Sequence, residues 1–202
     1  DTPQSCVELL QALRLAGYRV ENLPKTGDEL IQRLTATVTN DPESQGMRPV
    51  LQTLSNADYD AFFAQLPETV QQGICQRWGS PEQERSRPDN PNSESWPVAG
   101  LQLGQIFVGV QPSRGYDRDP TLNYHAPDLE PTHAYLAFYA WVRQQFGAQA
   151  IIHVGKHGNL EWLPGKGIGL SATCYPEAAL GALPHLYPFI VNDPGEGAQA
   201  KR

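Results

Sequence analysis

The chain of 202 residues is 40% hydrophobic and 18% charged, with a formal net charge of −7 at pH 7, as in an ordinary globular protein. It has no cluster of basic residues, which argues against nucleic acid as a partner, and no apolar run long enough to span a membrane. The three cysteines are scattered without the spacing of a metal site, which favours a reducing, cytoplasmic environment.

Residues 1–79 are predicted to be rich in helices. Capping patterns and apolar stripes indicate helices over 2–16, 26–37, 55–66 and 67–79, with a short strand over 18–20. The aromatic residues of the third helix, Tyr59, Phe62 and Phe63, recur at helical spacing. We therefore assign them to the core rather than to a ligand site.

Residues 80–98 are predicted to form a polar linker or a long loop. Positions 80–97 contain one aromatic residue and no aliphatic residue, so they offer little apolar surface to bury. This segment separates the helix-rich region from residues 99–202, although it need not separate independent domains.

Residues 99–202 are predicted to form an α/β region. The expected order is a strand over 100–110, a helix over 131–146, a strand over 149–152, a helix over 176–180 and a strand over 189–191. This alternation of strands and helices indicates an α/β fold with at least some parallel pairing. Glycine-rich loops follow the strand ends.

The longest of these loops runs from His153 to Gly169. Within it His153, His157 and Glu161 recur at four-residue steps, which would place them on one face of a helix. The many glycines argue against a regular helix, so we expect a loop with one helical turn around 160–163. Loops at strand ends are where α/β proteins commonly place their chemistry.

Two imidazoles and a carboxylate suit either a divalent metal ion or proton transfer. We therefore predict that His153, His157 and Glu161 form a functional cluster, with the roles of base and ligand left open among them. Phosphate binding is the obvious rival. A P-loop would require glycine at the position of Leu160 and a hydroxyl residue at Gly167, so we reject it.

Two other segments hold candidate residues. Asp117 and, less favourably, Asp119 follow the strand over 100–110, and Asp117 would join the cluster if that strand lies beside the one preceding the glycine-rich loop. An ordinary Asp-rich turn is the alternative. His133 lies in the first turn of the helix over 131–146, where the helix dipole lowers the pKa of an imidazole and favours its metal-binding neutral form. A solvent-facing His133 fits the sequence equally well.

Several long strings resemble one protein family. The segment G-K-H-G-N-L-E-W-L-P-G-K at 155–166 resembles the signature of the large subunit of aerobic, ATP-dependent cobaltochelatases (CobN), to which the magnesium chelatase H subunit is related. Further strings at 109–120, 131–139 and 184–197 agree. The magnesium subunits usually carry Thr, Ser and Phe where this chain has Lys156, Asn159 and Trp162, which favours the cobalt branch.

The resemblance implies a tetrapyrrole-binding subunit that inserts Co²⁺, as a substrate, into hydrogenobyrinic acid a,c-diamide during cobalamin biosynthesis. Insertion removes two protons from the macrocycle, so it needs a proton acceptor and ligands for the ion. We assign catalytic roles to Glu161, His157 and Asp117, and metal contacts to His153, His157, Glu161 and His133. The resemblance also implies that ATP is used by an AAA+ partner (CobS-like) working with a CobT-like subunit. No bound cofactor is expected in this chain.

Two alternatives stay open. One is magnesium insertion into protoporphyrin IX by an H-type subunit, and the other is a non-catalytic tetrapyrrole-binding module whose His and Glu residues only satisfy hydrogen bonds. CobN-type subunits are several times longer than this chain, which begins Asp-Thr-Pro and ends Gln-Ala-Lys-Arg. We therefore interpret it as a piece of such a subunit that is inactive alone.

Overall fold

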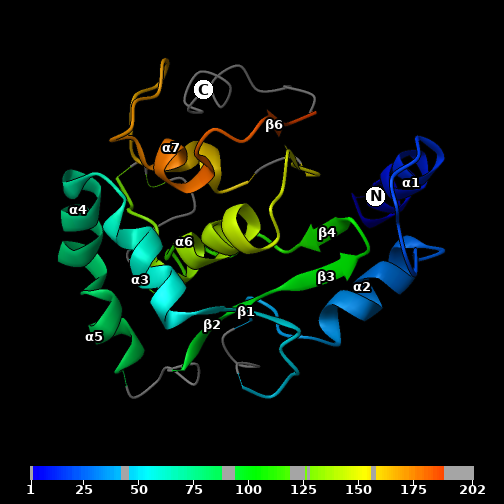
Figure 1. Ribbon diagram of the computed structural model, residues 1–202, viewed down its shortest axis with the longest axis horizontal. Coiled ribbons are helices and arrows are strands. Elements are labelled where there is room, and N and C mark those ends of the chain that lie inside the picture. The colour runs from blue at the N-terminus through cyan, green and yellow to red at the C-terminus, as the bar shows by residue number, and fades with distance from the viewer. Residues whose placement is uncertain are drawn as a thin grey trace. The chain divides into compact units, whose positions relative to one another are not determined.

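A computed structural model describes residues 2–41, 46–87, 94–118, 126, 128–155 and 158–188 (Figure 1). The chain divides into two compact units, Asp1–Thr53 with Pro97–Val110, and Leu54–Trp96 with Gln111–Arg202. The described part contains seven α-helices and three two-stranded sheets, which confirms the predicted α/β class. None of the described helices is long and apolar enough to cross a membrane.

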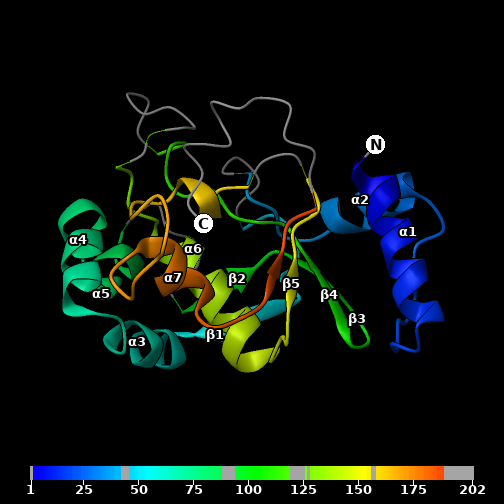
Figure 2. The same ribbon diagram turned by 90° about the horizontal axis from the view of Figure 1, so that it is seen from above.

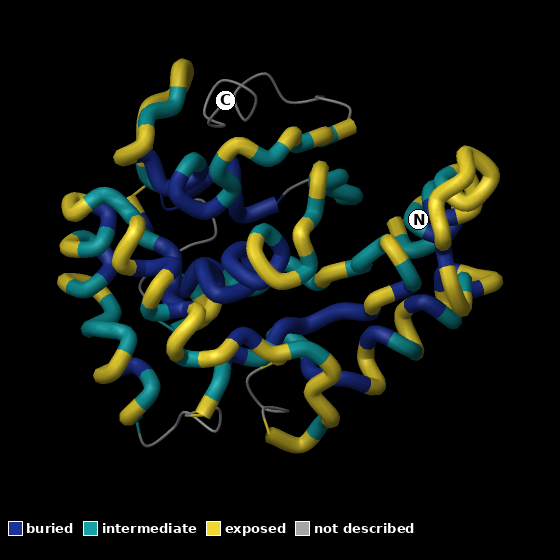
Figure 3. The backbone as a smooth tube through the Cα atoms, in the orientation of Figure 1, coloured by how far each residue is buried: buried dark blue, intermediate teal, exposed yellow. Residues whose placement is uncertain are grey.

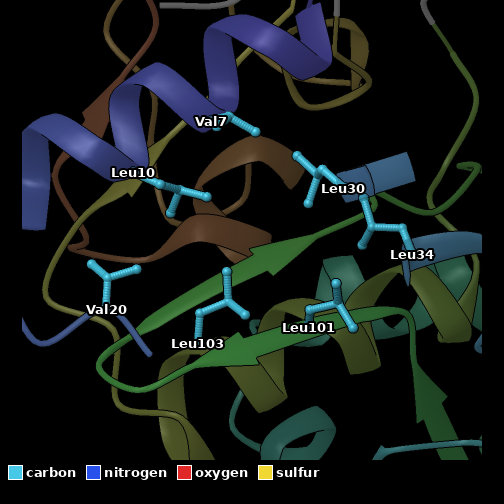
Figure 4. Packing of buried hydrophobic residues seen from close by; sticks show 7 residues of the cluster. All are labelled: Val7, Leu10, Val20, Leu30, Leu34, Leu101 and Leu103. Carbon is cyan, nitrogen blue, oxygen red and sulfur yellow. The ribbon is translucent and has the colours of Figure 1, made fainter. Parts of the chain in front are cut away.

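The first unit consists of two helices packed on a hairpin. Its elements are α1 (Thr2–Leu15), α2 (Gly27–Thr35), β3 (Gly100–Leu103) and β4 (Ile106–Gly109), and the two strands pair antiparallel. Buried apolar side chains from α1, α2 and β3, together with Val20, meet in one core, against which β4 packs partly buried side chains. Figure 4 shows the core residues Val7, Leu10, Val20, Leu30, Leu34, Leu101 and Leu103. Burying such side chains contributes about 1.5–3 kcal/mol each, so this core holds the unit together.

The strand expected over 100–110 is a hairpin instead. The chain reverses at Gly104, whose φ of 72° favours glycine, and a Cβ there would lie 2.6 Å from the carbonyl oxygen of Arg19. The apolar pattern continues on both sides of this turn, which hid it in the sequence. The strand expected over 18–20 is reduced to a single bridge between Val20 and Gly104.

The segment predicted as a linker is largely regular where it is described. Ser80 and Gln83 form a capping box that begins α5 (Pro81–Arg85), and β1 (Gln52–Ser55) pairs with β2 (Ser95–Val98). The helix was missed because it is anchored by charge rather than by aliphatic burial: Glu84 receives two hydrogen bonds, of 2.9 and 3.1 Å, from Arg118. The division into units also differs from the predicted one, because 97–110 joins 1–53.

The second unit is organised around α6 (His133–Ala140). Apart from one exposed position at 134, all of its residues are buried, as the dark tube in Figure 3 shows. Thr132 caps it, so the helix begins two residues later than predicted, and it continues as a π-helical turn, η2 (Trp141–Gln145). The other α-helices of this unit are α5 and three more, α3 (Asn56–Ala64), α4 (Glu68–Trp78) and α7 (Tyr175–Leu180).

Two short strands and one turn complete the second unit. The strand β5 (Ile151–Ile152) pairs in parallel with β6 (His185–Leu186), and the two run side by side in Figure 2. The turn expected around 160–163 is the 3₁₀ turn η3 (Leu160–Trp162). The strand expected over 189–191 lies outside the described residues, whereas β6 precedes it and was not predicted.

Candidate functional site

The strands β5 and β6 present aromatic rings on one face. Parallel pairing sets Ile151 opposite His185, and since side chains alternate along a strand, His153 and Tyr187 continue the same face. The backbone N–H of His153 donates to the carbonyl of Leu186 at 2.8 Å, which extends the ladder beyond the strands. The ring centroid of His153 lies 4.4 Å from that of Tyr187 and 6.3 Å from that of His185.

The turn η3 brings Glu161 to these rings. Glu161 is 8% exposed, and its Oε1 accepts hydrogen bonds from the Gly158 backbone N–H at 2.8 Å and from the Tyr187 hydroxyl at 3.0 Å. Gly158 also lies against His153, because a Cβ at position 158 would be 2.4 Å from the ring Cε1. We call the set His153, Glu161, His185 and Tyr187 the β5–β6 site.

The turn that carries Glu161 is held on both sides by the segment that follows β4. On one side, the backbone N–H of Asn159 donates to Gln111 Oε1 at 2.7 Å, and its Nδ2 donates to the carbonyl of Pro112 at 3.0 Å. On the other side, the fully buried Arg114 donates from Nη1 to the carbonyl of Trp162 at 3.0 Å. These contacts fix the position of the backbone at Glu161.

Helix α6 supports this arrangement from the protein interior. Gln111 Nε2 donates to the hydroxyls of Tyr135 and Tyr139, at 3.2 and 2.8 Å. Burial raises the pKa of both tyrosines, and the negative charge of Glu161 acts in the same direction. Both hydroxyls are therefore neutral near pH 7, and they serve as hydrogen-bonding partners rather than as charged groups.

The imidazole of His185 is poised to be neutral. Burial lowers its pKa, the neighbouring His153 lowers it further, and Glu161 opposes both effects. A neutral imidazole keeps a lone pair that can accept a proton or a metal ion. The β5–β6 site thus combines a buried carboxylate with two imidazoles and a tyrosine hydroxyl, which suits proton transfer.

A complete metal site is not formed by the described residues. Within the part of the chain that the structure describes, no three His, Cys, Asp or Glu side chains are arranged to hold a metal ion. His157 and Asp119, both named from the sequence, lie outside the described residues. The structure therefore brings His153 and Glu161 together through Gly158, and leaves the predicted ligand set untested.

Comparison with known proteins decides the family. The chain matches the CobN/Magnesium Chelatase family over residues 1–202. The chain belongs to this family. It is 56% identical over 202 residues to the aerobic cobaltochelatase subunit CobN of Pseudomonas aeruginosa, covering 100% of this chain and 16% of that protein. It is 37% identical over 205 residues to the magnesium-chelatase subunit ChlH of Oryza sativa, covering 98% of this chain and 14% of that protein.

A solved structure agrees with this assignment to the CobN/magnesium chelatase family. The fold matches the catalytic subunit of cobaltochelatase from Mycobacterium tuberculosis with a TM-score of 0.79 and 45% identity. The match covers 99% of this chain and 17% of that one. The resemblance seen in the sequence is confirmed, and the chain spans about a sixth of the length of these relatives.

Asp117 closely follows residues 111–114, which support the β5–β6 site, but it has other contacts. It is exposed and accepts a hydrogen bond from Ser113 Oγ, in a turn anchored by the ion pair between Arg118 and Glu84. Asp117 was expected to join the cluster if its strand lay beside the one preceding the glycine-rich loop, but among the described strands β4 pairs with β3 and β5 with β6. Residues 111–114 contact the loop instead. A catalytic part for Asp117 stays a prediction.

His133 lies in an aromatic cluster between α3 and α6. Its ring contacts Tyr59, Phe63 and Trp96, with Nδ1 2.7 Å from the Tyr59 hydroxyl and Nε2 2.9 Å from the Gly79 carbonyl. Burial lowers the pKa of His133, so the ring is neutral: Nε2–H donates to Gly79 and Nδ1 accepts from Tyr59. Both nitrogens have protein partners, so this geometry favours a structural role over the predicted metal contact.

Two members of the β5–β6 site, His185 and Tyr187, were missed by sequence reasoning. They stand two residues apart, the spacing that puts side chains on one face of a strand. That spacing could have indicated a strand over 185–187, but the strand was assigned instead to the more apolar run over 189–191. Gln111 and Arg114 were missed as well, because a buried supporting residue carries no pattern of its own.

Proposed function

We propose that this chain is part of the catalytic, tetrapyrrole-binding subunit of an ATP-dependent cobaltochelatase, which inserts Co²⁺ into hydrogenobyrinic acid a,c-diamide. The observation that carries the proposal is the buried carboxylate of Glu161, held by two donors beside His153 and His185. The higher identity to the CobN protein (56%) than to the ChlH protein (37%) supports cobalt rather than magnesium.

In this proposal Glu161 is the proton acceptor. Metal insertion breaks two pyrrole N–H bonds in turn, and the electron pair of each bond stays on nitrogen, which donates it to the divalent ion. Glu161 takes the first proton and passes it to water before it takes the second. A base must lie within hydrogen-bond reach of the N–H that it deprotonates, about 2.6–3.2 Å between heavy atoms or through one water. Of the two roles that the sequence leaves open for Glu161, we therefore assign it the base rather than the metal ligand.

The incoming ion is proposed to meet His153 and His157 before it enters the macrocycle. Neutral imidazoles suit borderline divalent ions such as Co²⁺. An ion in transit requires an open, incomplete ligand set, because the macrocycle must replace the protein ligands one after another. Asp117, at the exposed turn after β4, is proposed as a helper that attracts the hydrated cation. Affinity alone does not select cobalt, because such sites bind copper more tightly.

ATP hydrolysis is proposed to take place in partner subunits. The chain lacks the Gly-x-x-x-x-Gly-Lys-[Ser/Thr] pattern of a P-loop. We therefore assign ATP hydrolysis to a CobS-like AAA+ subunit with a CobT-like subunit, and expect this chain to be inactive without them. Assembly of that kind fits a cytoplasmic enzyme.

The proposed function is tested with the full-length subunit that contains this chain, combined with its ATPase partners and ATP. One reaction contains Co²⁺ and hydrogenobyrinic acid a,c-diamide, and the other contains Mg²⁺ and protoporphyrin IX. We expect Co²⁺ to enter hydrogenobyrinic acid a,c-diamide, followed by the change in the absorbance spectrum of the macrocycle, and no Mg²⁺ to enter protoporphyrin IX. Insertion of Mg²⁺ alone would assign the chain to the H-type subunits. Macrocycle binding without insertion of either ion would favour the non-catalytic module.

A further inference from the structure

The two oxygens of Glu161 have different surroundings. Oε1 accepts the backbone N–H of Gly158 at 2.8 Å and the hydroxyl of Tyr187 at 3.0 Å. A carboxylate oxygen has two lone pairs in its plane, so two donors use the full capacity of Oε1. The proton taken from a substrate must then go to Oε2.

We propose that Tyr187 is a positioning residue, which fixes the Glu161 carboxylate so that Oε2 is the oxygen that takes the proton from the macrocycle. This inference rests on the proposed function, because it assumes that Glu161 is the base. In the step itself, a pyrrole N–H bond breaks, an O–H bond forms at Oε2, and the electron pair stays on nitrogen for the metal ion. Tyr187 keeps its own proton throughout.

The structure holds Tyr187 firmly enough for such a part. Its ring packs edge-on against His153 at 4.4 Å between centroids and lies at 28° to the ring of His185 at 6.0 Å. It directly follows β6, whose register with β5 is fixed by backbone hydrogen bonds on both sides of the pair. The hydroxyl therefore reaches Glu161, in the turn η3, from the end of β6, 26 residues along the chain.

Fixing one oxygen matters because the carboxylate of a glutamate can rotate about χ3, whose preferred values are broadly distributed and nearly two-fold symmetric. With a single donor at Gly158, either oxygen could accept that hydrogen bond and the direction of the free lone pairs would vary. The second donor, which approaches from β6, selects one orientation. Such preorganisation raises turnover without changing how tightly the substrate is bound.

The test is Tyr187→Phe in the full-length subunit, assayed with its partner subunits for Co²⁺ insertion under single-turnover and steady-state conditions. The variant removes one hydroxyl and keeps the ring that packs on His153. We expect kcat to fall roughly tenfold to a hundredfold, the range for losing a hydrogen bond to a charged group, with KM for the macrocycle unchanged. Tyr18→Phe, at a 53% exposed tyrosine in the first unit, is the matched control and should keep normal turnover.

A double-mutant cycle with Glu161→Gln separates positioning from a general structural effect. If Tyr187 acts through Glu161, adding Tyr187→Phe to Glu161→Gln should lower the single-turnover rate no further. An equal additional loss in the double variant would overturn the inference, as would a Tyr187→Phe enzyme with normal kcat. A fully active Glu161→Gln enzyme would instead refute the proposed function, so the two failures are distinguishable.

Discussion

Glu161→Gln in the full-length subunit is expected to lower the rate of Co²⁺ insertion by about 10²–10⁴-fold, the usual contribution of a general base. The amide oxygen of glutamine can still accept hydrogen bonds from Gly158 and Tyr187, so the exchange keeps both bonds. It replaces the basic oxygen Oε2 with an amide nitrogen that cannot take a proton. Macrocycle affinity should therefore stay close to normal. The measurement is single-turnover insertion, together with a fluorescence or absorbance titration of macrocycle binding.

The same isosteric exchange at Glu8 provides the control for this prediction. Glu8 is exposed on α1 in the other unit, far along the chain from the β5–β6 site, and its exchange should leave insertion unchanged. If Glu161→Gln inserts Co²⁺ as fast as the parent enzyme, Glu161 is not the base. If it loses macrocycle binding instead, the carboxylate is a substrate-binding group.

Gly158→Ala is the second change for which we expect a large effect. A methyl group at position 158 would lie 2.4 Å from Cε1 of His153 and 3.1 Å from Oε1 of Gln111, so the imidazole must move. Displacing a reacting or positioning group by about 1 Å costs on the order of a hundredfold in rate. We expect insertion turnover to fall by about that factor, measured by absorbance in the assembled complex.

Gly167→Ala is a matched control in the same glycine-rich loop. A Cβ at position 167 has no atom within 4 Å, and its φ is not in the left-handed region, so the methyl group is tolerated. That variant should keep normal turnover and normal stability. Equal losses for both variants would mean that the loop needs flexibility in general rather than close contact between Gly158 and His153.

The sequence predicted helices well where a capping residue stands next to an apolar stripe of helical spacing. Thr26, Ser55 and Gly79 mark helix ends in the structure as they do in the pattern, and the turn around Glu161 was expected from its glycine-rich flanks. These signals are local, since each depends on residues within one or two turns. The capping box that begins α5 was missed although it is also local, because the absence of aliphatic residues was given more weight.

The site itself could be predicted only in part. His153 and Glu161 share one loop, so their joint involvement could be read from a single string of residues. The partners that position Glu161, such as Tyr187 and Arg114, come from segments 26 and 47 residues away, and only the pairing of β5 with β6 and the buried course of residues 111–114 bring them together. For His133, a place at a helix start suggested a ligand, whereas Tyr59 and Gly79 engage both of its nitrogens, which favours a structural role.

A structure of the full-length subunit with its metal-free macrocycle bound would decide whether Glu161 is placed to remove a proton from that macrocycle. We expect Oε2 of Glu161 to lie about 2.6–3.2 Å from a pyrrole nitrogen, or to be joined to it by one water, while Oε1 keeps its hydrogen bonds to Gly158 and Tyr187. A macrocycle bound with its nitrogens away from Glu161 would contradict this expectation.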